Sequence, residues 1–118
     1  MEAQQWARVE RALTEPIRCE AVDLARDAGS FTIRGTTGSR YHVTMLASDW
    51  PPACTCDDFF WRGPELRCKH ICFTLLLCGC PAASVADPDW EPSERELKRV
   101  LRSLASSCGW AKVETPPG

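Results

Sequence analysis

The chain has 118 residues, enough for one compact domain and too few for a large multidomain enzyme. Its net charge of −2 and pI of about 5.7 argue against a broadly basic, nucleic-acid-binding surface, while 44% hydrophobic and 25% charged residues are typical of a globular fold. The longest apolar run, residues 71–77, is too short to cross a bilayer, and the N-terminus lacks the features of a signal peptide. We therefore expect an intracellular protein, nuclear or cytoplasmic, with no membrane partner.

The first predicted element is an amphipathic helix over residues 2–14. Trp6, Val9 and Leu13 recur at spacings of three and four, and a proline then ends the pattern. We expect these three side chains to face the core. In residues 17–25, alternate positions are apolar, as in a strand, although some of them also fit a helix face. The alternation favours a strand.

A β-hairpin is predicted next. Residues 31–34 and 41–45 alternate between apolar and polar side chains, and a Gly-Thr-Thr-Gly segment separates the two runs. Residues 49–52 then break the pattern, because consecutive prolines fit neither a helix interior nor a central strand. We expect a second unit to begin there.

The C-terminal half carries two helical patterns. Residues 69–78 are apolar on nearly every side and are followed by a glycine and a proline, which predicts a buried helix. Residues 81–92 have the composition of a linker loop. A Ser-x-x-Glu capping box at residues 93–96 begins a helix that extends to about residue 106, and we expect residues 111–118 to form a frayed tail.

Eight cysteines, at positions 19, 54, 56, 68, 72, 78, 80 and 108, are the main chemical signal. In a reducing compartment, clustered Cys and His residues more often bind a metal than form disulfides. Cys54 and Cys56 project to the same side of an extended chain, so both sulfurs can reach one ion. Cys68 and His70 converge on that ion only if Cys68 precedes a helix and His70 lies in its first turn.

These four residues, Cys54, Cys56, Cys68 and His70, predict one zinc ion per chain. Three thiolates and one imidazole form a closed set of protein ligands, as in structural sites, whereas a catalytic zinc keeps a position open for water. We therefore expect a non-enzymatic protein with no catalytic residues. A thiol enzyme that uses Cys68 as nucleophile and His70 as base is the weakest alternative.

The roles of three further cysteines stay open. Cys72 lies one helical turn after Cys68 and could replace the histidine as a ligand, but a small buried side chain is the simpler interpretation. Cys78 and Cys80 form a second CxC pair, whose other ligands would have to come from scattered positions. We therefore expect a single metal site.

The segment CTCDDFFWRGPELRCKHICFTLLL, residues 54–77, resembles the SWIM zinc finger, named for Swi/Snf remodellers and Mutator-type plant transposases. The resemblance is carried by CxC, the glycine in the gap, and CKHI running into an apolar helix. The flanks resemble SWIM domains of ubiquitin-ligase-type proteins, so the similarity extends over residues 7–105. It implies a ββα zinc module for protein or DNA interaction. No RING ligand series follows residue 80, so ligase activity is not implied.

The fold class that follows is α+β, with a small antiparallel sheet of two or three strands, flanking helices and a ββα zinc finger. Residues 1–46 hold the N-terminal helix and hairpin, and residues 47–80 hold the SWIM-type finger. Residues 81–118 hold the linker, the last helix and the tail. All three parts are expected to form one compact domain.

The leading hypothesis for function is a protein-interaction module. The gap between the two ligand pairs must bulge outward, and it contains the candidate partner-binding residues Phe59, Phe60, Trp61 and Arg62. Exposed aromatic and arginine side chains are typical anchors of interfaces. A substrate-recruiting role in a ubiquitin ligase system is a variant of this hypothesis.

The alternative is a nucleic-acid-binding module. One side of the last helix carries a candidate phosphate patch, for which a solvated helix face is the simpler explanation: Arg95, Lys98, Arg99 and Arg102. Arg62, Arg67 and Lys69 would add positive charge beside the zinc. A steep loss of affinity with salt would distinguish this alternative from protein binding.

Overall fold

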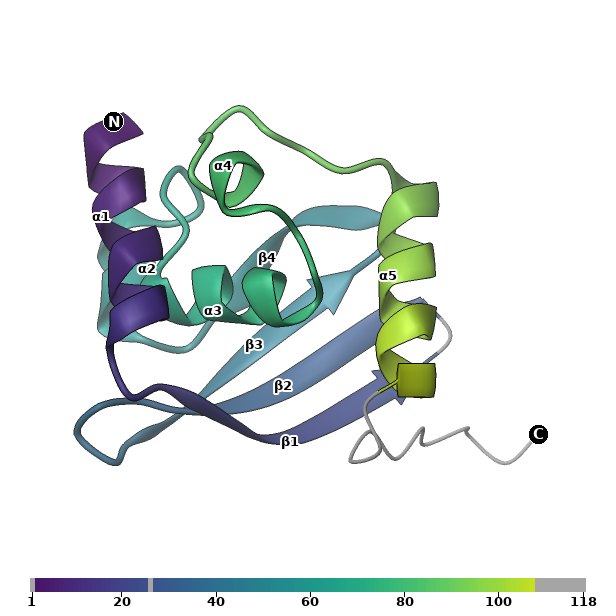
Figure 1. The fold of residues 1–118 in the computed structure, drawn as a ribbon, viewed down its shortest axis with the longest axis horizontal. Coiled ribbons are helices and arrows are strands. Elements are labelled where there is room, and N and C mark those ends of the chain that lie inside the picture. The colour runs from purple at the N-terminus through teal and green to yellow at the C-terminus, as the bar shows by residue number, and fades with distance from the viewer. Residues whose placement is uncertain (1, 26, 108–118) are drawn as a thin grey trace.

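The computed structural model describes residues 2–25 and 27–107, and Figure 1 shows their fold. The helices and strands are, in chain order, α1 (Glu2–Thr14), β1 (Arg18–Ala25), β2 (Ala28–Arg34), β3 (Arg40–Leu46), β4 (Asp49–Cys54), α2 (Asp57–Arg62), α3 (Lys69–Leu77), α4 (Ala82–Val85) and α5 (Glu94–Ser107). The predicted α+β class is confirmed. The predicted tail, residues 111–118, lies outside the described residues.

The strands form one antiparallel sheet in the order β1-β2-β3-β4. The expected hairpin is β2 and β3, and the strand favoured for residues 17–25 is β1. Phe31 lies opposite both Val22 and Val43, and all three side chains are buried. Because side chains alternate along a strand, this register gives the sheet one buried face and one exposed face.

The prediction of two or three strands was one short, because residues 49–52 do not break the sheet. They belong to β4, which pairs with β3 through Val43 opposite Cys54 and Thr44 opposite Ala53. A proline cannot donate to a ladder, but an edge strand pairs on one side only and can tolerate it. The consequence for the site is direct, because Cys54 is the last residue of this paired strand.

Helix α1 buries a different face from the one its hydrophobic spacing predicted. Val9 is fully buried as expected, but Trp6 is 43% exposed and Leu13 is 61% exposed. The buried side of the helix instead includes Gln5 and Arg8. These polar side chains are buried because the surface they contact consists of backbone groups and a carboxylate.

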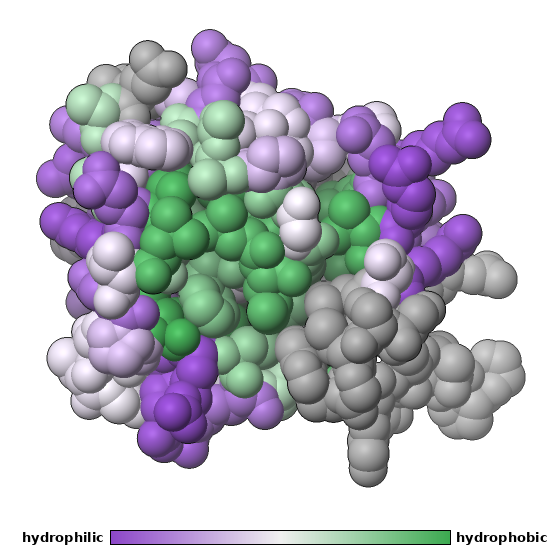
Figure 2. Space-filling model, in the orientation of Figure 1, coloured by the Kyte–Doolittle hydropathy of each residue, from purple (hydrophilic) through white to green (hydrophobic). Residues whose placement is uncertain are grey.

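Helices α3, α4 and α5 lie in front of the sheet in Figure 1, with α1 packed beside α3. Helix α4 is a short turn of helix within the segment predicted to be a loop. Figure 2 shows hydrophobic residues gathered in the middle of this face, over α3 and the neighbouring sheet. No helix of the described residues is long and apolar enough to span a membrane.

The last helix begins as predicted. The Ser93 hydroxyl accepts from the backbone N–H of Glu96, and the Glu96 carboxylate accepts from the backbone N–H of Ser93, each at 3.1 Å. Leu97 and Leu101 are buried and attach α5 to the sheet next to β2.

We expect Gln5 to be essential for the attachment of α1. Its amide donates to the carbonyl oxygen of Arg67 at 2.9 Å and accepts from the N–H of the same residue at 2.8 Å. A Gln5→Leu variant leaves both buried groups unsatisfied and should lower the free energy of unfolding by about 1–3 kcal/mol. Urea denaturation measures the change. Gln4→Leu, on the exposed side of α1, is the matched control and should change stability by less than about 0.5 kcal/mol.

Candidate metal centre

The CxC pair is held in extended backbone at the end of the sheet. Cys54 ends β4, and Cys56 is the N-cap of α2 with φ −79° and ψ 162°. Between them, the Thr55 hydroxyl accepts from the N–H of His42 at 3.0 Å, and the Thr55 N–H donates to the His42 carbonyl at 3.1 Å. Thr55 is exposed while both cysteines are buried. The two sulfurs therefore point to one side, as the spacing predicted.

The second pair sits at the start of α3. Cys68 is the N-cap, and His70 is the second residue of the helix, which confirms the predicted placement. The N–H of Ile71 donates to the Cys68 sulfur at 3.5 Å, and the N–H of Phe59 donates to the Cys56 sulfur at 3.4 Å. Two thiolates thus take the place of capping oxygens, and the helix N-termini stabilise their negative charge.

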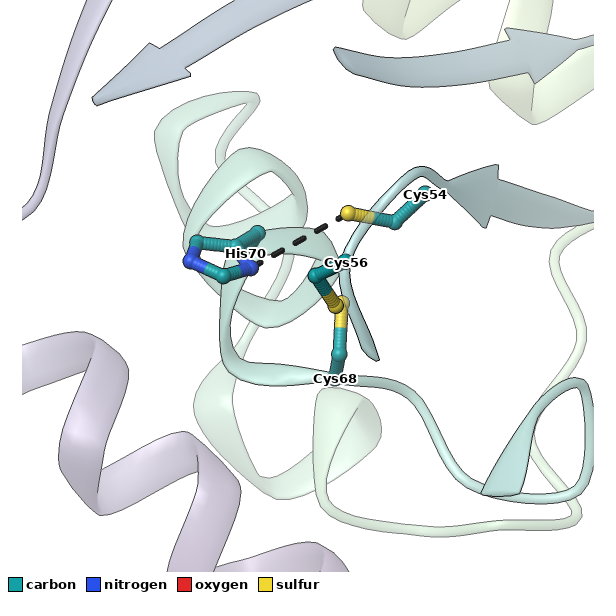
Figure 3. A group of neighbouring side chains, drawn as sticks. All are labelled: Cys54, Cys56, Cys68 and His70. Carbon is teal, nitrogen blue, oxygen red and sulfur yellow. Dashed lines mark hydrogen bonds between the residues drawn. The ribbon is translucent and has the colours of Figure 1, made fainter. Parts of the chain in front are cut away.

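The four predicted ligands meet at one point, as Figure 3 shows. One ligand atom from each of Cys54, Cys56, Cys68 and His70 lies within 4.8 Å of all the others, and every one of the four side chains is buried. The Nδ1 atom of His70 lies 3.9 Å from the Cys54 sulfur. Tetrahedral coordination with metal–sulfur bonds of about 2.3 Å places ligand atoms roughly 3.8 Å apart. The residues therefore fit a single metal ion.

Protons bind to this cluster unevenly when no cation is present. Hydrogen bonds from Cys54 and Cys68 lower the pKa of the Cys56 thiol well below its ordinary value. The hydrogen bond to Cys56 raises the pKa of Cys54 to about 12, and hydrogen bonds with Cys54 and Cys56, together with burial, raise that of Cys68. Three converging thiols thus hold one negative charge readily and three only with difficulty. A divalent cation resolves this conflict by replacing the protons.

The histidine is fixed by stacking. Its ring lies 4.3 Å from the ring of Tyr41 with an interplanar angle of 29°. The Nε2 atom of His70 is buried, has no hydrogen-bond partner among the described residues, and faces Gly35, where an added Cβ would lie 3.0 Å from Tyr41 and 3.4 Å from Nε2. Because Gly35 has no side chain, the stacked rings of Tyr41 and His70 can lie against its backbone. The Nδ1 atom of His70 then remains available to bind a metal.

Two polar contacts of α1, and a third made by Glu15 directly after it, tie this part of the chain to the ligand-bearing segments. Gln5 binds the backbone of Arg67, as described above. Arg8 forms a two-pronged ion pair with Asp58 of α2 at 2.7 and 2.8 Å, and Glu15 pairs with Lys69 of α3 at 2.6 Å. The burial of Gln5 and Arg8 was not predicted, because a polar residue in an amphipathic helix gives no sign in the sequence that it is buried.

Arg67 was wrongly assigned to a positive surface beside the metal. It is 5% exposed, and its guanidinium donates to the backbone carbonyls of Val85, Asp87 and Trp90 at distances from 2.6 to 3.0 Å. It also lies 5.7 Å from the ring centres of Trp50 and Trp90. Arg67 therefore organises the chain after α4 and is unavailable to a phosphate. Lys69 is held by its ion pair.

The remaining cysteines stand apart from this centre. Cys72 is buried and accepts a hydrogen bond from the Gln5 amide at 3.4 Å, and burial raises its pKa to about 12. Among residues 2–25 and 27–107, the four ligands form the single cluster of Cys, His, Asp or Glu placed to hold a metal. Cys78 and Cys80 are half-buried and lie outside that cluster, and Cys108 lies outside the described residues.

The candidate partner-binding residues form α2. Phe60 and Trp61 are 74% and 77% exposed, and their rings make an edge contact at 5.0 Å. Arg62 is exposed beside them, whereas Phe59 is half-buried and packs against the core. Among the candidate phosphate residues on α5, Lys98 pairs with Glu94 at 3.0 Å and lies 3.9 Å from Asp27, whereas Arg95, Arg99 and Arg102 are exposed.

Comparison with models of known protein families, with curated proteins and with solved structures finds no match to the chain. The site assignment therefore rests on the residues and their geometry.

We expect one metal ion per chain, bound by the four clustered side chains. Removing one thiolate leaves three ligands, so Cys56→Ser should lose most of its metal when the protein is dialysed against a weak chelator. Cys72→Ser is the matched control, because this cysteine is equally buried and lies outside the cluster. Metal content is measured by inductively coupled plasma mass spectrometry. Two ions per chain, or full retention in Cys56→Ser, would contradict the assignment.

Proposed function

We propose that the chain is a zinc-binding module of the SWIM type, in which the metal is structural. The observation that carries this proposal is the closed set of three buried thiols and one buried imidazole within 4.8 Å of one another. Sulfur-rich tetrahedral sets favour zinc over magnesium or calcium, which prefer oxygen ligands. With four protein ligands, no coordination position is left for a reacting water.

The spacing of the ligands supports the SWIM assignment. The pattern of that family is present in this chain. It consists of a CxC pair at the end of a β-strand, an eleven-residue gap, and a CxH pair that opens an apolar helix. A non-enzymatic role inside the cell follows from the proposal. The buried cluster offers neither an exposed nucleophile nor an open metal position.

The role we propose for the module is binding to another protein through α2. This helix has no buried residue, yet it exposes two large aromatic rings next to an arginine. Aromatic and arginine side chains are enriched among the residues that contribute most to protein interfaces. Recruitment of a substrate in a ubiquitin ligase system is one form that such binding could take.

Nucleic-acid binding through α5 is the second candidate. Arg95, Arg99 and Arg102 are exposed on this helix. Glu94 and Glu96 border the same surface, and the whole chain has a net charge of −2, which opposes long-range attraction to a polyanion. Charge therefore favours the protein-binding proposal.

If the zinc is structural, its removal should unfold the segment that it joins. Structural zinc contributes about 10–16 kcal/mol of apparent binding free energy, which also stabilises the fold. Chelation should therefore abolish the protection of backbone amides in residues 68–77 against hydrogen exchange. The measurement is hydrogen exchange by mass spectrometry with and without a zinc chelator. Unchanged protection in the metal-free protein would show that the metal is not structural.

The partner surface is tested by Trp61→Ala in the zinc-loaded protein. Loss of an interface anchor should weaken binding by on the order of 2 kcal/mol, so proteins captured by the immobilised chain should be depleted in the variant. Trp6→Ala removes an equally large, partly exposed ring from α1 and should leave capture unchanged. Quantitative mass spectrometry compares the two variants.

Normal capture by Trp61→Ala would contradict the role of α2. Nucleic-acid binding would replace it if Lys98→Glu with Arg102→Glu abolished binding to an oligonucleotide and that binding fell steeply with salt.

A further inference from the structure

The sheet has a second face that carries no helix of the described residues. Helices α3 and α5 pack on the face that holds Phe31 and Val43 (Figure 1), whereas Ser30, His42 and Thr44 point to the other side and are exposed. This second surface, which we call the open face, is formed mainly by small and hydroxyl-bearing side chains and has charged residues at one end.

Three arginines lie side by side at that end. The register places Arg34 of β2 opposite Arg18 of β1 and opposite Arg40 of β3. Neighbouring strands are about 4.8 Å apart, so the three Cα atoms span about 10 Å. We call these three residues the arginine row. Like charges directly opposite one another destabilise a sheet, so the row is not explained by strand pairing.

One carboxylate lies within the row. Glu20, at the bulge of β1, accepts from Nε of Arg40 at 2.6 Å and lies 3.0 Å from Nε of Arg34. The hydrogen bond from Arg40 and then the nearby charges of Arg34, Arg40 and Arg18 lower the pKa of Glu20. Glu20 therefore carries a full negative charge near neutral pH.

The charges of this cluster do not balance. Three positive charges face one negative charge, which leaves a local excess of two on a chain whose net charge is −2. Arg18 forms no ion pair within the described part of the chain. The Nε atom of Arg34 is buried against Glu20, so the donors that this side chain could offer to a further anion are its terminal NH2 groups. Donors for another anion are thus present in the row.

We propose that the arginine row binds the phosphate monoester of a phosphorylated protein segment. A monoester carries a charge of about −1.5 to −2 at neutral pH and has three acceptor oxygens, so it matches the local excess and the several guanidinium donors. A carboxylate has only two acceptor oxygens and a single negative charge, so it matches the local excess less well than a phosphate monoester does. The side chain of Glu20 already places one carboxylate in the row. The site adds a second contact surface to the proposed protein-interaction module and needs neither α2 nor the metal ligands for its chemistry.

The rest of the open face favours one phosphate on a protein over a nucleic-acid strand. Beyond the row, the next positions across the sheet are Ala21, Thr32 and His42, so the single imidazole of His42 is the one ring here, and it does not form the series of aromatic side chains on which successive bases stack. Further along β1, Asp23 adds a negative charge that would repel a second phosphate. Hydroxyl groups such as that of Thr32 suit the backbone of an extended peptide.

The test is an NMR titration of the zinc-loaded full chain that follows the Nε–H signals of its arginines. The probe is a short alanine peptide with one central phosphoserine, and peptides with serine or glutamate at that position are the comparisons. The phosphopeptide should shift the signals of Arg18, Arg34 and Arg40 in a saturable way, with at least about tenfold weaker binding for the glutamate peptide and none for the serine peptide.

Arg34→Gln with Arg40→Gln should weaken phosphopeptide binding by about tenfold or more. Arg95→Gln with Arg99→Gln on α5 changes the net charge by the same amount and should leave binding unchanged. Because the first pair also contacts Glu20, Arg18→Gln serves as the second variant. It breaks no ion pair of the described residues and should still weaken binding by at least about threefold.

Equal binding of the phosphoserine and serine peptides would overturn the proposal. The proposal would also be overturned if Arg95→Gln with Arg99→Gln weakened phosphopeptide binding as much as Arg34→Gln with Arg40→Gln. If a single-stranded oligonucleotide shifted the row at lower concentration than the phosphopeptide, with a steep salt dependence, the site would be assigned to nucleic acid instead. None of these results depends on Trp61, so they leave the proposed role of α2 to its own test.

Discussion

The meeting of four buried ligand atoms within 4.8 Å is the constraint on which the rest of the structure depends. It fixes the end of β4, the first residue before α2 and the first turn of α3 relative to one another. Such a cluster is unfavourable without a cation, because the pKa values of Cys54 and Cys68 are raised and only Cys56 ionises readily. A bound cation replaces the mutual repulsion of the three thiolates with attraction between each thiolate and the metal. The fold around the site should therefore depend on the metal.

Helix α1 acts as the second constraint, and it does so through polar contacts. A segment that turns its sulfurs inward presents its backbone and charged side chains to the other side, and these groups need partners. Gln5 and Arg8 of α1 supply partners to the backbone of Arg67 and to Asp58, and Glu15, the residue after the helix, supplies one to Lys69. This explains why α1 leaves Trp6 exposed. If α1 turned its Trp6 side toward this surface, the buried polar groups that Gln5 and Arg8 now bind would be left without partners.

The sequence was sufficient for the parts of the structure that depend on local spacing. The α+β class, the hairpin, the capping box at Ser93 and the convergence of the four ligands all follow from residues close together in the chain. The sequence was insufficient where the conformation or burial of a segment depends on the neighbouring element against which it packs. Edge position makes residues 49–52 a strand despite two prolines, and a polar neighbouring surface decides which face of α1 is buried. The arginine row is formed by strand register alone, because its members lie 16 and 6 positions apart.

The position of α2 depends on one of the residues placed to hold the metal. A helix of six residues is far too short to be stable alone, and this one has no fully buried residue, so apolar burial contributes to its position only through the half-buried Phe59. It is held instead by Cys56 at its N-cap and by the ion pair between Asp58 and Arg8. Both anchors lie in its first turns and leave the rings of Phe60 and Trp61 in solvent. Exposed aromatic rings gain little from folding, so the rings of Phe60 and Trp61 remain available as a contact surface, which is the feature on which the proposed role of α2 rests.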